Sequence, residues 1–101
     1  MLTVVLVDDT IAPVSKHDRT LAAIFAEPVR ASVKWADVES LLENKGATIT
    51  AGRGSRVRIL LNGIMAVFHR PHPQPNTDKG ALKSVRRLLS EAGITPPSPN
   101  D

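Results

Sequence analysis

Apolar side chains recur every three or four residues in two segments of the first half of the chain, which is the helical period. The first segment runs from Lys16 to Ala26, and Glu27-Pro28 ends it because the residue before a proline disfavours the helical conformation. The second runs from Lys34 to Lys45 and is followed by Gly46, a residue suited to a C-terminal cap. We predict two helices with apolar faces formed by Leu21, Ile24, Phe25, Trp35, Val38, Leu41 and Leu42.

From Ala47 the hydrophobic period changes from helical to two, which is the period of a strand. Three strands are predicted, over Ala47–Ala51, Arg56–Leu61 and Ile64–His69. Gly52–Ser55 joins the first two, and Asn62-Gly63, the strongest short hairpin signal, joins the last two. In the middle strand arginines alternate with branched apolar residues, so one face of the antiparallel sheet should be basic and the other apolar.

A proline-rich loop over Arg70–Thr77 precedes a last helix that Thr77 or Asp78 can cap and that extends to about Ala92. Its apolar stripe consists of Leu82, Val85, Leu88 and Leu89. Helices should cover the apolar face of the sheet, which predicts an α+β two-layer sandwich of helix, helix, three antiparallel strands and helix.

Length and composition indicate one domain, over residues 16–94. Residues 1–15 form an N-terminal extension that begins as a possible strand over residues 2–7 and then loses its pattern. Residues 95–101 are expected to be a disordered tail. The chain has no cysteine, which excludes disulfides and thiol chemistry and fits a cytoplasmic protein. It has no apolar run long enough to span a membrane, and only three aromatic residues, too few for an aromatic base-stacking platform.

Basic residues are concentrated in one stretch. Residues 45–90 carry nine Lys or Arg side chains against one acid, Asp78, for a net charge of +8, whereas residues 1–44 carry −3 and residues 91–101 carry −2. A segment with this charge favours polyanionic partners, such as RNA. A solvated face with scattered charge is the alternative, although such surfaces usually mix both signs.

Two sets of residues are candidates for contact with nucleic-acid phosphates, and we expect both to face the same nucleic-acid backbone. One comprises the glycine turn and the basic face of the middle strand; the other lies along the last helix. Arginine binds two phosphate oxygens with its planar fork, and backbone N–H groups in a glycine turn can approach a phosphate, although the turn can also be a plain hairpin connection. The residues expected to bind nucleic acid, which the family resemblance given below implies is RNA, are Arg53, Gly54, Ser55, Arg58, Arg70, Lys79, Lys83, Arg86 and Arg87.

His69 and His72 are the candidates for proton transfer, because imidazole titrates near neutrality. A structural role, in which they satisfy backbone carbonyls of the proline-rich loop, is the common alternative. A metal site is not expected, since no third ligand lies nearby in the sequence.

Several short motifs, in this order and spacing over roughly residues 34–94, resemble the HicA toxins of bacterial toxin–antitoxin pairs. They are Asn44-Lys45-Gly46-Ala47, Gly52-Arg53-Gly54-Ser55, Phe68-His69-Arg70-Pro71-His72-Pro73, Lys79-Gly80 and Glu91-Ala92-Gly93-Ile94. The resemblance implies a fold like the double-stranded-RNA-binding domain, an mRNA interferase activity that needs no cofactor, and a HicB-type antitoxin as partner. Domains of that fold read RNA mainly by shape, phosphate and 2′-hydroxyl contacts.

Arg56 departs from the family pattern, in which a catalytic histidine usually follows the glycine-serine of the turn. Arginine stays protonated and cannot act as the base, but it can stabilise charge on the phosphate. Either His69 or His72 supplies the proton transfer, or the protein binds RNA and cleaves it poorly. A third hypothesis is an interaction protein whose basic face only binds an acidic antitoxin.

Overall fold

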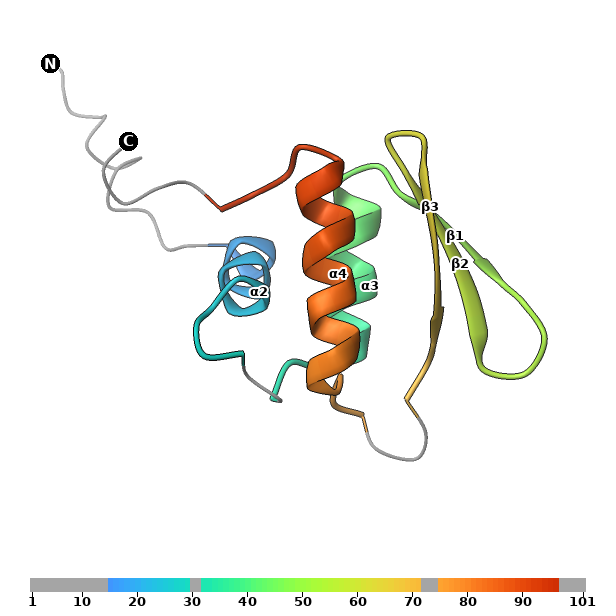
Figure 1. The fold of residues 1–101 in the computed structure, drawn as a ribbon, viewed down its shortest axis with the longest axis horizontal. Helices are drawn as coiled ribbons and strands as arrows, with labels where there is room; N and C mark the ends of the chain where they lie inside the picture. The colour runs from blue at the N-terminus through green and yellow to red at the C-terminus, as the bar shows by residue number, and fades with distance from the viewer. Residues whose placement is uncertain (1–14, 30–31, 72–74, 97–101) are drawn as a thin grey trace, which may run out of the picture.

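The computed structural model describes residues 15–29, 32–71 and 75–96 (Figure 1). Every helix and strand predicted between residues 16 and 92 is present, and the helix predicted to reach Ala26 ends at Ile24. The expectations for residues 1–14 and 97–101 lie outside the described residues. In chain order the elements are α2 (Lys16–Ile24), α3 (Trp35–Asn44), β1 (Thr48–Ala51), β2 (Arg56–Leu61), β3 (Ile64–His69) and α4 (Lys79–Glu91).

The three strands form one antiparallel sheet in the order β1-β2-β3. Leu61 pairs with Ile64, so the connection is a two-residue hairpin, as the Asn62-Gly63 signal predicts. Asn62 and Gly63 have φ angles of 50° and 82°, the positive values that a turn matching the twist of the strands requires. This turn fixes the register of β2 and β3, and with it which side chains face the helices.

Helices α3 and α4 cover one face of the sheet, and α2 packs against both helices on the side away from the sheet (Figure 1). The predicted α+β sandwich is confirmed in α3, α4 and the sheet, whereas the position of α2 as a further layer was not predicted. Leu21 and Ile24 of α2 are buried, so the apolar face of this short helix is covered where it packs on the helix pair.

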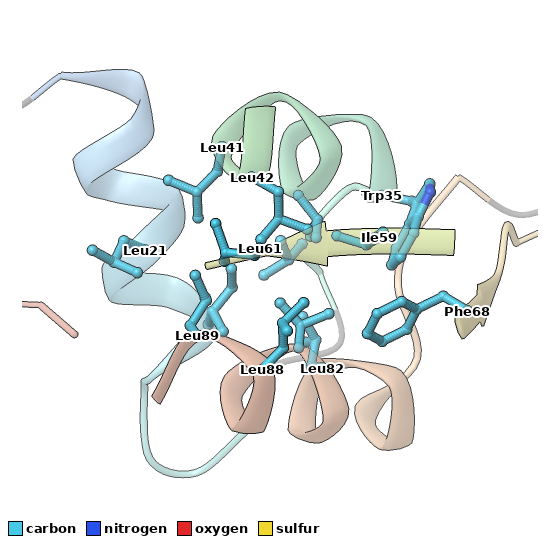
Figure 2. Packing of buried hydrophobic residues seen from close by; sticks show 14 of the residues in the cluster. Leu21, Trp35, Leu41, Leu42, Ile59, Leu61, Phe68, Leu82, Leu88 and Leu89 are labelled. Atoms are coloured by element: carbon cyan, nitrogen blue, oxygen red, sulfur yellow. The ribbon is translucent and has the colours of Figure 1, made fainter. Parts of the chain in front are cut away.

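One hydrophobic cluster connects the helices and the inner face of the sheet (Figure 2). The sheet contributes the alternate residues of β2 that the strand period predicts, and each helix contributes its apolar stripe. The members with no exposed surface are Ile24, Val38, Leu41, Leu42, Val57, Ile59, Leu61, Leu82, Val85 and Leu89. None of the helices in the described part of the chain has the length and apolar character to cross a bilayer.

Asp78 caps the N-terminus of α4, because its Oδ1 accepts a hydrogen bond from the backbone N–H of Ala81 at 2.7 Å. We expect Asp78→Ala to lower the free energy of unfolding by about 1 kcal/mol, since this N–H loses its partner. Urea denaturation measures the change. Asp78→Asn is the matched control: it keeps an oxygen acceptor and should behave like the parent, and an equal loss in both variants would contradict the capping role.

Candidate nucleic-acid interface

The side of the sheet that faces away from α3 and α4, here called the outer face, carries the residues that alternate with the core positions. Side chains opposite each other in an antiparallel pair project to the same face, so the register assigns the members from all three strands. They are Thr48 and Thr50 of β1, Arg56, Arg58 and Leu60 of β2, and Met65, Val67 and His69 of β3.

Arg56 and His69 form the last rung of the β2–β3 ladder, here called the terminal rung. Hydrogen-bonded and non-hydrogen-bonded pairs alternate along an antiparallel ladder. Counting from the hairpin pair Leu61–Ile64, the terminal rung is a non-hydrogen-bonded pair, whose Cα atoms typically lie about 4.5 Å apart. Both residues are exposed. The guanidinium and the imidazole therefore project side by side into solvent.

The predicted glycine turn lies next to the terminal rung. The N–H of Gly52 donates to the carbonyl oxygen of Arg56 at 2.7 Å, and the N–H of Arg56 donates to that of Arg53 at 3.2 Å. Gly54 has a φ of 63°, a conformation that glycine adopts without strain. Arg53 and Ser55 are exposed. The turn thus holds further polar groups beside Arg56.

The outer face is basic only at the end near the glycine turn, which corrects the expectation of a basic face throughout. Toward the hairpin it becomes apolar: Leu60 is 41% exposed, Met65 55% and Val67 52%. The expectation was based on β2 alone, which places two arginines on this face. The register shows that β3 contributes to the same face, and its outward side chains are mostly apolar. The face therefore has a basic end and an apolar end.

Three basic residues of α4, namely Lys79, Lys83 and Arg86, do not share the outer face, which corrects the expectation that both sets face one backbone. Lys79, Lys83 and Arg86 line one hollow together with Glu27, Pro28 and Val29. This hollow lies on the α2 side of α4, because residues 27–29 follow α2 directly. The sheet and α2 lie on opposite sides of α4 (Figure 1). The start of α4 and the glycine turn do lie toward the same, lower end of the molecule in Figure 1.

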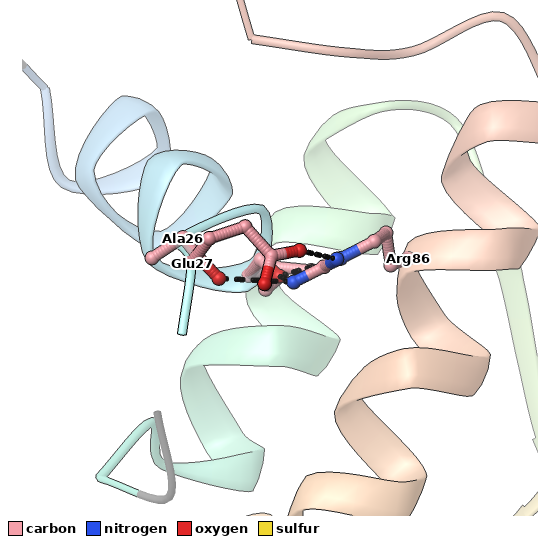
Figure 3. Close-up of polar contacts among 4 residues, drawn as sticks. Ala26, Glu27 and Arg86 are labelled. Carbon is pink, nitrogen blue, oxygen red and sulfur yellow. Dashed lines mark hydrogen bonds and ion pairs between the residues drawn. The ribbon is translucent and has the colours of Figure 1, made fainter. Parts of the chain in front are cut away.

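Arg86 holds the end of α2 (Figure 3). Its guanidinium donates to the carbonyl oxygen of Ile24, with Nε at 3.2 Å and Nη2 at 3.1 Å, and to that of Ala26, with Nη2 at 3.0 Å. It also pairs with Glu27 through Nη1 at 2.5 Å and lies 5.8 Å from the centre of the Phe25 ring. These contacts occupy the side chain that the sequence assigned to RNA. Arg87 instead lines a groove beside β3 with Met65 and Val67.

Arg70 is also occupied by a partner within the protein. Its Nε lies 2.8 Å from Oε2 of Glu39 and its Nη2 lies 3.1 Å from Oε1, so the fork binds both carboxylate oxygens. The hydrogen bond and the charge of Glu39 raise the pKa of the Arg70 guanidinium above its ordinary value. The N–H of Arg70 donates to the carbonyl oxygen of Ser55 at 2.8 Å. This second contact joins the end of β3 to the glycine turn.

Glu39 and Trp35 meet at this contact, and neither was among the predicted site residues; Trp35 was predicted only as part of an apolar helix face. Their spacing of four residues places them on one side of α3, so a Trp–Glu hydrogen bond was predictable, but the partnership with Arg70 was not. His72, the other candidate for proton transfer, lies outside the described residues. Within the described ranges, no three His, Asp or Glu side chains form a group that can hold a metal ion.

The fold and this surface define a small α+β domain of the double-stranded-RNA-binding type, with arginine and histidine at one end of its sheet. Residues 35–94 match the family model described as the HicA toxin of bacterial toxin-antitoxin systems. Because the match covers more than half of the chain, the protein belongs to the HicA toxin family, as the motifs indicated. Toxins of this family are typically ribonucleases. No curated protein and no solved structure gives a match.

Proposed function

We propose that this HicA toxin is a metal-independent endoribonuclease of the cytoplasm that cleaves mRNA at the terminal rung of its sheet. The observation that carries the proposal is the cross-strand pair of Arg56 and His69, exposed together beside the glycine turn in a member of a ribonuclease family. RNA phosphates are bound by Arg53, Arg58 and the backbone of Gly54-Ser55, which lie next to this pair.

In the proposed reaction His69 takes the proton of the ribose 2′-hydroxyl. The 2′-oxygen then attacks the adjacent phosphorus, the bond from phosphorus to the 5′-oxygen breaks, and the 5′-oxygen takes a proton from water or from a second acid, for which His72 is the candidate. Arg56 stabilises the negative charge that develops on the phosphate oxygens. The products are a 2′,3′-cyclic phosphate and a 5′-hydroxyl, so the reaction needs no cofactor.

The alternative is a protein that binds RNA without cutting it. Arg56 at the position usually occupied by the family's catalytic histidine favours this alternative, since a guanidinium cannot transfer the proton. The two functions share the binding surface and differ in product. Incubation of the purified protein with RNA, followed by analysis of the fragment ends, distinguishes them: cyclic phosphate ends support cleavage, and intact RNA in a stable complex supports binding alone.

A HicB-type antitoxin is the proposed partner, and occlusion is the proposed means of inhibition. A partner that covers the basic end of the outer face blocks the phosphate site, and the neighbouring apolar residues Leu60, Met65 and Val67 offer surface that such a protein can bury. The excess of basic residues over residues 45–90 favours an acidic partner.

The two basic surfaces are compared by matched charge reversals, Arg58→Glu on the outer face and Lys83→Glu in the α4 hollow. We expect Arg58→Glu to weaken RNA binding strongly and to lower the slope of log K against log salt by about 1. Lys83→Glu should have the smaller effect, because only one end of α4 lies toward the glycine turn. Fluorescence anisotropy with a labelled RNA over a salt series measures both. A larger loss in Lys83→Glu would contradict the assignment to the outer face.

A further inference from the structure

We propose that Glu39 and Arg70 are positioning residues that hold Arg56 and His69 in the geometry needed for RNA cleavage. The proposal rests on the function proposed above and extends it to residues that touch no substrate. It assigns Arg70 to an ion pair with Glu39 within the protein, whereas the sequence predicted that Arg70 binds RNA.

Arg70 and His69 point to opposite sides of the sheet. His69 lies on the outer face and Phe68 is buried, and by the period of two the next residue, Arg70, points to the same side as Phe68. Arg70 therefore reaches toward the helix layer, where its fork binds both oxygens of Glu39 on α3. The direction of Arg70 thus helps to fix the opposite direction of His69.

Glu39 is itself held by the core. The Nε1 of Trp35 donates a hydrogen bond to Oε2 of Glu39, the same oxygen that accepts from Nε of Arg70. Trp35 is buried and its ring lies 5.5 Å from that of Phe68, centre to centre. The Glu39 side chain is only 18% exposed, compared with 45% for Arg70. A buried tryptophan and a shielded carboxylate therefore anchor the partly exposed arginine.

The terminal rung needs such an anchor because it lies at the end of the ladder. End rungs fray more readily than central ones, since they have neighbours on one side only. The bond from the N–H of Arg70 to the carbonyl of Ser55 extends the pairing one step beyond Arg56 and His69. While Glu39 holds Arg70, the hydrogen bond from Arg70 to Ser55 stays formed. Arg56 and His69 then behave as a pair inside the ladder and not as its frayed end.

The ion pair is expected to contribute little to overall stability, because Arg70 is 45% exposed and pairs near the surface typically contribute between 0 and about 1 kcal/mol. The positioning role instead predicts a local effect with little change in the free energy of unfolding. A displacement of about 1 Å at a reacting group can reduce the rate by about a hundredfold, so loosening of the terminal rung should be visible in catalysis.

The test is Glu39→Gln, which leaves an oxygen to accept from Trp35 but removes the charged fork. We expect the amide of Arg70, which donates to the carbonyl oxygen of Ser55, to exchange hydrogen about tenfold faster. We also expect kcat for RNA to fall about tenfold while KM changes less than about twofold. The control is Asp37→Asn, the same chemical change on the same helix, at a carboxylate paired with the exposed Lys16 at 3.2 Å. It should leave exchange at the Arg70 amide and RNA cleavage unchanged.

Unchanged exchange at the Arg70 amide in Glu39→Gln would overturn the proposal. A rise in KM at constant kcat would also overturn it, because it would mark Glu39 and Arg70 as residues that act in RNA binding. If Glu39→Gln fails to fold, Arg70→Lys decides, because lysine keeps the charge but cannot form the fork. Exchange is measured without RNA. A parent protein that does not cleave RNA would therefore refute the proposed function while the exchange data still test the anchor.

Discussion

His69→Ala is expected to reduce RNA cleavage by the purified protein by about two to four powers of ten. The reason is that His69 is the only imidazole of the described residues on the outer face, where Arg56 is its cross-strand partner. Without it, no described group beside the terminal rung can take the 2′-hydroxyl proton. RNA affinity should change little, because the phosphate contacts are assigned to arginines and to the glycine turn. Single-turnover cleavage and anisotropy measure the two effects separately.

His17→Ala is the control for this prediction, since His17 lies on α2, on the far side of α3 and α4 from the sheet. It should cleave RNA at the parental rate. His72→Ala is made in parallel, because His72 was predicted as the second candidate for proton transfer. A full loss of activity in His72→Ala together with parental activity in His69→Ala would move the chemistry away from the terminal rung. Parental activity in both variants would refute the histidine mechanism altogether.

Arg86→Ala is expected to lower the free energy of unfolding by about 3 kcal/mol. The variant leaves the carbonyl oxygens of Ile24 and Ala26 without the charged donor that joins the end of α2 to α4. Hydrogen bonds to charged groups typically contribute about 1.5–3 kcal/mol each, and the Arg86 side chain is only 23% exposed. Urea denaturation measures the loss, and RNA affinity of the folded fraction should be close to that of the parent.

Arg87→Ala is the matched control, because it removes the same charge from the next position of α4, where the side chain is exposed. It should change the free energy of unfolding by less than about 0.5 kcal/mol. Equal stability of Arg86→Ala and Arg87→Ala would contradict the structural role of Arg86. So would a large loss of RNA affinity at unchanged stability, which would return Arg86 to the RNA-binding residues.

The elements of the fold were predictable because their signals are local. The Asn62-Gly63 turn, the alternation in Arg56–Leu61 and the apolar stripe of α4 each depend on neighbouring positions only. The place of α2 was not predictable, because its short apolar face suits a helix pair as well as a sheet. Long-range packing decides between the two, and sequence periodicity carries no information about it.

The candidate site was predictable in part for the same reason. The register that pairs Arg56 with His69 follows from the hairpin turn, so this pair could be inferred from the sequence. The partners of Arg70 and Arg86 could not, because Glu39 and Glu27 lie 31 and 59 residues away along the chain. The basic side chains of residues 45–90, a stretch with a net charge of +8, look alike in the sequence. The structure distinguishes those that have partners within the protein from those that face solvent.

The central claim is that RNA binds the basic end of the outer face, and amide chemical-shift mapping tests it most directly. The probe is an RNA with 2′-O-methyl groups throughout, which cannot form the cyclic phosphate and so stays intact during titration of the ¹⁵N-labelled protein. The account predicts that the largest shifts fall on residues 53–58 and 67–70. Shifts confined to residues 27–29 and 79–86, the hollow between α4 and the end of α2, would contradict it.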